Sequence, residues 1–185
     1  MQGQAAPLAA VLDLNTDLLL NCLDGLSETE ARERLAGGGN SAAFLAAHLT
    51  DTRHFLAGRL GHPLDNPLAP FLEGARSIEE IRTWPALDEI RSAWLAISAH
   101  LQRVLGAMSP ADLSRPNAHR FPLSDGTGLG LIAFLVQHDC YHLGQVAFLR
   151  RQLGKPAMAY TRAPRPGPAT NAESGASGRS AQRLV

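Results

Sequence analysis

The feature that most constrains this chain is a helical spacing of apolar residues, which recurs in four long segments. The segments cover about residues 7–24, 41–60, 86–105 and 129–153, and in each one apolar side chains recur every three or four positions. No segment shows the strict alternation that is typical of a half-buried strand. Four amphipathic helices with long inter-helix connections predict an all-α protein, an up-down four-helix bundle.

Capping residues mark several of the expected helix ends. Ser27 and Glu30 have the spacing of a capping box and predict the start of a short helix. Asn40 or Ser41 is the expected N-cap of the second long helix. Gly154 is the expected stop of the last one, because glycine readily adopts the conformation that ends a helix.

The length of 185 residues suits one domain followed by a tail. We expect the bundle to cover residues 1–155. Residues 156–185 are rich in Pro, Gly, Ser, Ala and Arg, a composition that cannot form a packed core. This segment is therefore predicted to be a flexible C-terminal tail that the fold does not require.

The charge balance narrows the range of partners. The chain has 17 basic and 17 acidic residues and a net charge of zero, which argues against electrostatic binding of nucleic acid or of an anionic membrane. Asp13, Asn15 and Asp17 interrupt the apolar N-terminal stretch, so neither a signal peptide nor a membrane span is expected. Two cysteines without a CxxC motif suit a cytoplasmic location. A small-molecule substrate is the expected partner.

The strongest chemical signal is a pair of histidines on the last helix. His138 and His142 are four residues apart, which places both imidazoles on one helix face, one turn apart. Leu135 and Leu149 share that face, so the pair lies within the apolar stripe. Two buried polar rings need partners. The pair either binds a metal ion or consists of core histidines that hydrogen-bond to protein groups.

A third histidine strengthens the metal interpretation. His48 falls within the apolar stripe of the second long helix. Three inward-facing histidines on two helices can form a three-nitrogen site with open coordination positions, the pattern of catalytic zinc. His54 is six residues further along, which turns it off the same face. Packing of all three rings as ordinary core residues remains the alternative.

Other polar residues near these faces are candidates for a pocket or for support of the ligands. Asn15 interrupts the first apolar stripe and is either a satisfied core amide or a pocket-lining group. Asp51 follows His48 by three residues and is positioned to flank a site, and Gln145 shares the face of the histidine pair. Asp139 lies near the edge of that face, where we expect it to support the ligands or to face solvent.

Two stretches resemble the signature of the DinB-like damage-inducible proteins. These are HDCYHLGQV at residues 138–146, followed by LRRQLGKP at residues 149–156. Residues 40–49, which include His48, resemble the upstream histidine segment of that family. The resemblance covers about residues 8–156, and the motif on the last helix is its specific part.

The resemblance implies a four-helix bundle that holds a divalent metal ion, zinc or nickel, on His48, His138 and His142. It also implies a homodimer, a link to stress responses, and a relation to thiol S-transferases and a thiol-dependent maleylpyruvate isomerase. We therefore expect a metal-dependent enzyme that transfers a low-molecular-weight thiol to an electrophilic substrate. The alternatives are a metal-dependent hydrolase and a non-enzymatic, stress-associated bundle that binds a metal or another ligand.

Overall fold

The chain folds into helices joined by loops and turns. The structure, a computed structural model, describes residues 3–35, 38–73, 78–118 and 121–162. Within these ranges no β-strand is present, which confirms the predicted all-α class. The elements, in chain order, are α1 (Ala6–Leu23), α2 (Glu28–Arg32), α3 (Ala42–Arg59), α4 (Ala69–Leu72), the 3-10 helix η1 (Ile78–Glu80), α5 (Leu87–Ala107), α6 (Pro110–Ser114) and α7 (Gly128–Gln152).

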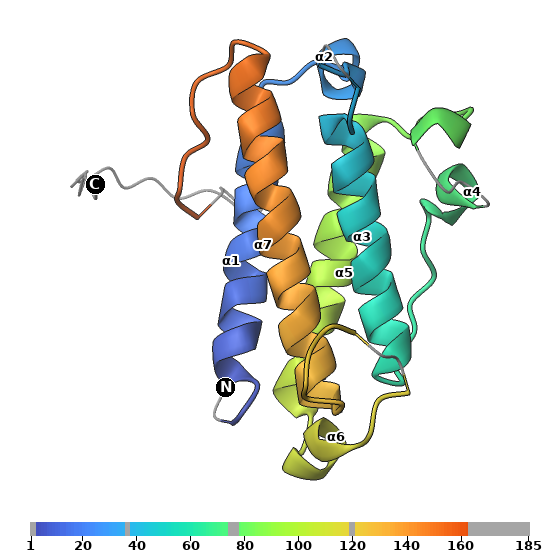
Figure 1. Cartoon of the computed structure of the whole chain (residues 1–185), viewed down its shortest axis with the longest axis vertical. Coiled ribbons are helices and arrows are strands. Elements are labelled where there is room, and N and C mark those ends of the chain that lie inside the picture. The colour runs from blue at the N-terminus through green and yellow to red at the C-terminus, as the bar shows by residue number, and fades with distance from the viewer. Residues whose placement is uncertain (1–2, 36–37, 74–77, 119–120, 163–185) are drawn as a thin grey trace, which may run out of the picture.

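The four long helices α1, α3, α5 and α7 form a bundle (Figure 1). α1 packs against α5 and α7, and α3 packs against the same two helices. The predicted four-helix bundle with long connections is confirmed. Its order of directions is up, down, down, up, because the connection that carries α4 and η1 returns the chain to the end of the bundle where α3 begins (Figure 1).

Local sequence signals account for the helix ends. Ser27 and Glu30 form the predicted capping box at the start of α2. At α3 the Ser41 hydroxyl accepts a hydrogen bond from the backbone N–H of Phe44 at 3.2 Å. Gly154 follows α7 with a φ of 77°, a conformation that favours glycine. The predicted boundaries of the long helices therefore lie within a few residues of the observed ones.

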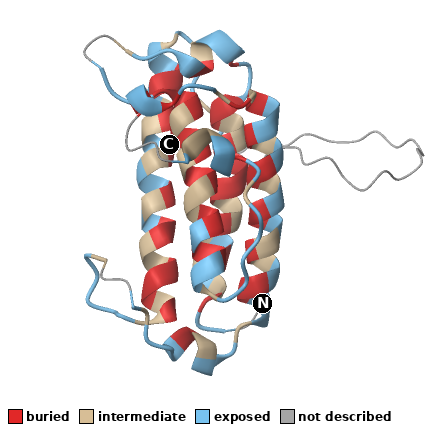
Figure 2. Ribbon diagram, turned by 90° about the vertical axis from the view of Figure 1, so that its right-hand side faces the viewer, coloured by how far each residue is buried: buried red, intermediate tan, exposed pale blue. Residues whose placement is uncertain are grey.

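The buried residues line the inside of the bundle along its whole length (Figure 2). They form two apolar clusters, one at the end where α3 begins and one at the end where α6 lies. Between the clusters lies a layer of buried polar side chains, to which each long helix contributes. This polar layer consists of Asn15, Thr16, Arg53, Ser98 and Asp139.

The start of the predicted tail lies against α1. The Asn21 side chain donates hydrogen bonds to the carbonyl oxygens of Ala159 and Thr161 at 2.6 and 2.7 Å. Arg162 forms ion pairs with Asp13 and Asp17 at 2.5 and 3.1 Å. These contacts join residues 156–162 to the bundle. The rest of the predicted tail, 163–185, lies outside the described residues, and its flexibility stays a prediction.

One described helix, α1, is long and apolar enough to cross a membrane by length and composition alone. Half of its 18 residues are buried inside the bundle. Core helices of soluble proteins meet the same criterion, so this is weak evidence for a span.

Candidate metal centre

Three histidine side chains converge between α3 and α7, and we call them the histidine triad. His48 comes from α3, and His138 and His142 lie one turn apart on α7. The Nε2 atom of His138 is 3.2 Å from Nε2 of His48 and 3.1 Å from Nε2 of His142. All three side chains are partly buried, and one ligand atom of each lies within 4.8 Å of the others. The arrangement can hold a metal ion.

The Nδ1 atoms of His138 and His142, which are not part of the Nε2 cluster, show how the two rings are supported. Nδ1 of His142 is 2.6 Å from Oε1 of Gln145. Since an amide oxygen only accepts, Nδ1 carries the proton and Nε2 is left with its lone pair. Nδ1 of His138 is buried and has no partner among the described residues. Gln145 therefore fixes the tautomer that a metal ligand requires at His142.

Aromatic rings pack beside the triad on both helices. The Phe44 ring stacks on His48 with a centroid distance of 6.1 Å and an interplanar angle of 2°. The Tyr141 ring meets His142 edge to face at a centroid distance of 5.0 Å. These contacts restrict the rotation of both imidazoles, and so help to keep their nitrogens directed at one point.

Electrostatics favour the neutral form of two triad rings, His48 and His138. Burial, followed by repulsion from His142 and His48, lowers the pKa of His138 to about 4. Burial and repulsion from His142 also lower the pKa of His48, and the Asp51 carboxylate opposes this shift. Neutral imidazole is the form that binds a metal ion. At neutral pH both rings are thus ready to act as ligands.

The convergence of three Nε2 atoms fits a cation better than it fits hydrogen bonding. A neutral imidazole has a single N–H group, and Nε2 of His138 faces two other Nε2 atoms. One proton can serve only one of these contacts, so the cluster cannot satisfy itself. A cation bound by three lone pairs satisfies all of them. The donor set therefore suits a divalent metal ion.

Directly behind the triad, the polar layer joins α3 to α7. Arg53 donates from Nε and Nη2 to Oδ2 of Asp139 at 3.0 and 2.7 Å, and both side chains are 2% exposed. Its remaining N–H groups bond to Thr16, Ser98 and the carbonyl oxygen of Leu12. Burial raises the pKa of Asp139, and the Arg53 guanidinium opposes that rise.

Arg53 did not appear among the residues predicted from the sequence. A signal was present, since Arg53 is four residues after Leu49 and three before Leu56, both of which are fully buried. This spacing places it on the core face of α3. For Asp139 the structure decides between the two expected roles. It is buried in the polar layer, next to His138, and does not face solvent.

The remaining predicted residues take different places. The Asn15 amide is buried in the polar layer and bonds to Sγ of Cys140 at 3.4 Å. Asp51 accepts a hydrogen bond from the Asn66 amide at 2.9 Å and influences His48 only through its charge. Nδ1 of His54 is 2.9 Å from the carbonyl oxygen of Leu64, away from the triad. Among Asn15, Asp51 and Gln145, only Gln145 bonds directly to a triad ring.

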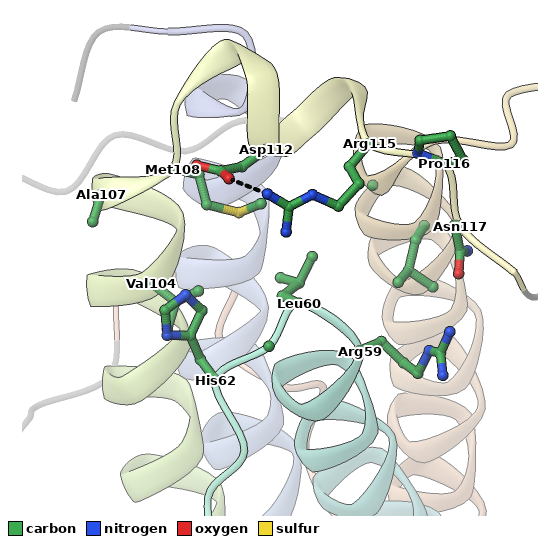
Figure 3. A pocket seen from close by; sticks show the side chains of 13 residues that line it. Arg59, Leu60, His62, Val104, Ala107, Met108, Asp112, Arg115, Pro116 and Asn117 are labelled. Carbon is green, nitrogen blue, oxygen red and sulfur yellow. Dashed lines mark hydrogen bonds and ion pairs between the residues drawn. The ribbon is translucent and has the colours of Figure 1, made fainter.

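A cavity of about 400 Å³ lies at the end of the bundle near α6 (Figure 3). Arg59 and Arg115 line it, and the Arg115 guanidinium is paired with Asp112 at 3.1 Å. Arg59 is eleven residues from His48 along α3, which corresponds to roughly 16 Å of helix. This cavity therefore does not open onto the triad.

Together, the fold and the triad define a helical bundle with a three-histidine cluster that can hold a metal ion. Comparison with known protein families assigns the chain to one of them. The DinB superfamily model matches residues 12–146, so the chain belongs to the DinB superfamily. None of the functionally curated proteins compared with the chain matches it.

Two solved structures share the fold. A conserved protein from Enterococcus faecalis has 17% sequence identity and a TM-score of 0.67, over 84% of this chain and 100% of its own. A DinB-like protein from Bacillus subtilis has 15% identity and a TM-score of 0.58, over 85% of this chain and 99% of its own. At this level of identity the likeness concerns the fold.

Proposed function

We propose that this protein is a metal-dependent enzyme that transfers a low-molecular-weight thiol to an electrophilic substrate. The observation that carries the proposal is the convergence of His48, His138 and His142: one ring nitrogen of each lies within 4.8 Å of the others, and Nε2 of His138 contacts Nε2 of both other rings. Zinc or nickel is the expected ion, because imidazole nitrogens suit both. Membership of the DinB superfamily supports the same interpretation.

The number of ligands supports a catalytic site. Structural zinc sites are closed by four protein ligands, whereas catalytic sites keep a position open for water or substrate. The triad offers three histidines, and the described residues add no further histidine, cysteine or carboxylate to this group. When bound, the ion supplies Lewis acidity, which lowers the pKa of a thiol and orients its sulfur.

The protein's own thiols are not placed to act as the nucleophile. Burial raises the pKa of Cys22 to about 12, and this side chain is fully buried. Sγ of Cys140 contacts Asn15, on the other side of α7 from the triad. A separate thiol would therefore provide the sulfur. The thiol first loses its S–H proton to solvent. The thiolate sulfur then forms a bond to the electrophilic carbon as the bond from that carbon to the leaving group breaks, and the leaving group departs with that electron pair and takes up a proton.

A metal-dependent hydrolase is the second candidate, because a carboxylate lies near the triad. Asp51 is close enough to His48 for its charge to oppose the fall in the pKa of that ring. A carboxylate in this position can serve as a general base toward water. Asp139 cannot take this role, because it is buried and paired with Arg53.

Elemental analysis and substitution of the triad test the proposed site. Protein purified without chelator should contain stoichiometric zinc or nickel. Replacing His48, His138 or His142 by alanine should weaken metal affinity about 100-fold or more, since each change removes a ligand. His54→Ala is the matched control on α3. It removes a buried ring outside the triad and should lower stability without lowering metal content.

Two results would contradict or redirect the proposal. Unchanged metal content in a His138→Ala/His142→Ala double variant would show that the ion binds elsewhere. A screen of low-molecular-weight thiols against electrophiles should reveal turnover that requires both the thiol and the triad. Turnover that needs the triad but no thiol would favour the hydrolase.

A further inference from the structure

A second cavity lies between α7 and the connection from α2 to α3, and two of its lining residues contact His142. We call it the α7 cavity. Its volume is about 490 Å³, which is within the range of small-molecule sites. Tyr141 and Gln145 line it, and these two residues also contact His142. A molecule in the α7 cavity would therefore contact two side chains that themselves contact His142.

The described lining of the α7 cavity carries no charged side chain. It consists of five apolar or aromatic residues, three glycines, and the amides Asn40 and Gln145. The Arg34 guanidinium lies next to Gly38 but is already engaged, since Nε donates to the carbonyl oxygen of Gly39 at 2.7 Å and Nη2 pairs with Glu79 at 2.6 Å. Burying an ionic group without a counter-charge is costly. The cavity thus favours an uncharged ligand.

The α7 side of the cavity presents two exposed aromatic rings. Tyr141 is 59% exposed and Phe148 is 58% exposed, and the two lie seven residues apart on one face of the helix. Gly144 lies between them, and a Cβ atom added there would meet nothing within 4 Å. The glycine leaves a gap between the rings. A flat apolar ring fits such a gap, since it can stack against aromatic side chains.

Gln145 provides a polar contact at the inner end of the cavity. Its Oε1 atom binds Nδ1 of His142, and its amide N–H₂ group has no partner among the described residues. An amide N–H₂ donates hydrogen bonds. It can bind a carbonyl, ether or hydroxyl oxygen of a molecule in the cavity. The same side chain thus connects the ligand position to the triad.

We propose that the α7 cavity binds the electrophilic substrate, and that this substrate is an uncharged, ring-containing molecule with an oxygen acceptor near its reactive carbon. Anionic electrophiles should bind more weakly, because no charged side chain among the described lining residues is available to pair with a carboxylate. The inference rests on the proposed function for the identity of the site, but the selectivity of the cavity is measurable without turnover.

The test uses two fluorescent probes of nearly equal shape, titrated with the full-length protein at pH 7. 2-Naphthol is uncharged at this pH and 2-naphthoate is an anion. We expect 2-naphthol to bind about tenfold or more tightly than 2-naphthoate, because only the anion must lose its hydration without gaining a partner. Equal binding of both probes, or tighter binding of the anion, would overturn the proposal.

Two variants locate the binding position. Gly144→Leu fills the gap between the rings and should reduce 2-naphthol affinity about tenfold or more. Gly58→Leu is the matched control, because Gly58 is also an exposed helical glycine with open space around its Cβ position. Phe148→Ala removes one ring and should also weaken binding. Unchanged affinity in both Gly144→Leu and Phe148→Ala would place the probe elsewhere and refute the cavity.

The failure of this inference is distinguishable from failure of the proposed function. Metal content should be the same in Gly144→Leu, Gly58→Leu and the wild type, since none of these changes touches the triad. Metal binding without any selective binding of 2-naphthol would refute the inference alone. Light scattering of the same samples tests the alternative that a second copy of the chain occupies the α7 cavity. A dimer that Gly144→Leu converts to monomer, with neither probe bound, would also overturn the proposal.

Discussion

Arg53 uses all of its guanidinium N–H groups inside the bundle. Two of its five hydrogen bonds reach Asp139, and the other three reach Thr16, Ser98 and Leu12. The guanidinium also lies 3.6 Å from the centroid of the Trp94 ring. A buried charge is tolerated only when it is paired and fully hydrogen-bonded, and Arg53 meets both conditions.

Removing the arginine alone should be more harmful than removing the pair. Arg53→Met leaves Asp139 buried without a counter-charge, and we expect it to lower the free energy of unfolding by about 3–5 kcal/mol. The double variant Arg53→Met/Asp139→Leu removes both charges and should recover a large part of this loss. Urea denaturation of the three proteins measures the difference. A double variant that is less stable than Arg53→Met would contradict the coupling of the two charges.

At the scale of single residues, the sequence predicts which side chains can bind a metal better than it predicts how these side chains lie in space. The spacing of His138 and His142 places both rings on one face, because the helical repeat is regular. The approach of His48 to this pair depends on how far α3 is shifted along its axis relative to α7. The apolar spacing on each helix is equally compatible with alignments that differ by a full turn. The α7 cavity was also beyond prediction, since the loop that follows α2 forms one of its walls.

Among the elements, the segment after α7 shows most clearly where composition misleads. Residues 156–162 have the composition of a tail, yet they contact α1 at several points. Nε of Arg150, near the end of α7, binds the carbonyl oxygen of Pro156 at 2.8 Å, and Sγ of Cys22 lies 3.2 Å from Sδ of Met158. Polar side chains and backbone carbonyls make most of these contacts, and composition does not report on them.

Two truncations separate the parts of this segment. A chain that ends at Arg162 should keep the stability and metal content of the full-length protein, since the missing residues have a composition that cannot form a packed core. A chain that ends at Pro156 also loses the contacts to Asn21, Asp13 and Asp17, and should be about 1–3 kcal/mol less stable. Thermal or urea unfolding measures both. Equal stability of the two truncated chains would mean that these contacts contribute nothing.

The elements themselves were largely predictable, and their directions were not. Capping residues and apolar repeats define each long helix, because both are local properties of the chain. The direction of α5 depends on the course of the connection between Leu60 and Ala86. That connection is long enough to run along the bundle or to stay at one end. The structure shows that it runs along the bundle, which makes α3 and α5 parallel (Figure 1).

For the whole molecule, the low pKa of a triad ring links stability to pH. In metal-free protein the pKa of folded His138 is about 4, whereas the ordinary value is 6.5. Below pH 6.5 the unfolded chain takes up a proton at this ring before the folded chain does. The contribution of His138 to stability is therefore complete above pH 6.5, and is lost as the pH falls toward 4.

Urea unfolding of chelator-treated protein between pH 7.5 and 4.5 tests this linkage. The wild type should lose stability toward acid, and His138→Gln should show a flatter dependence because it lacks the titrating ring. Identical pH profiles for the two proteins would show that the folded ring is not protected from protonation. With metal bound, the loss should be steeper, since protons then also compete with the ion for its ligands.

The family resemblance also implies an assembly of two chains. We propose a homodimer, for which light scattering should give about twice the chain mass of 19.7 kDa. The mass should be measured for both metal-loaded and chelator-treated protein, so that any dependence of dimerisation on the ion is detected. A mass near that of one chain under both conditions would refute the dimer.

The triad joins two points that are 90 residues apart in the chain, His48 and His138. An ion held by both would act as a removable crosslink. It could form only after α3 and α7 have come together, because the closure of so long a loop is entropically unfavourable until other contacts support it. Such an ion would then contribute little to the rate of folding and more to the lifetime of the folded state. Metal supply would thus set how long each molecule survives between unfolding events.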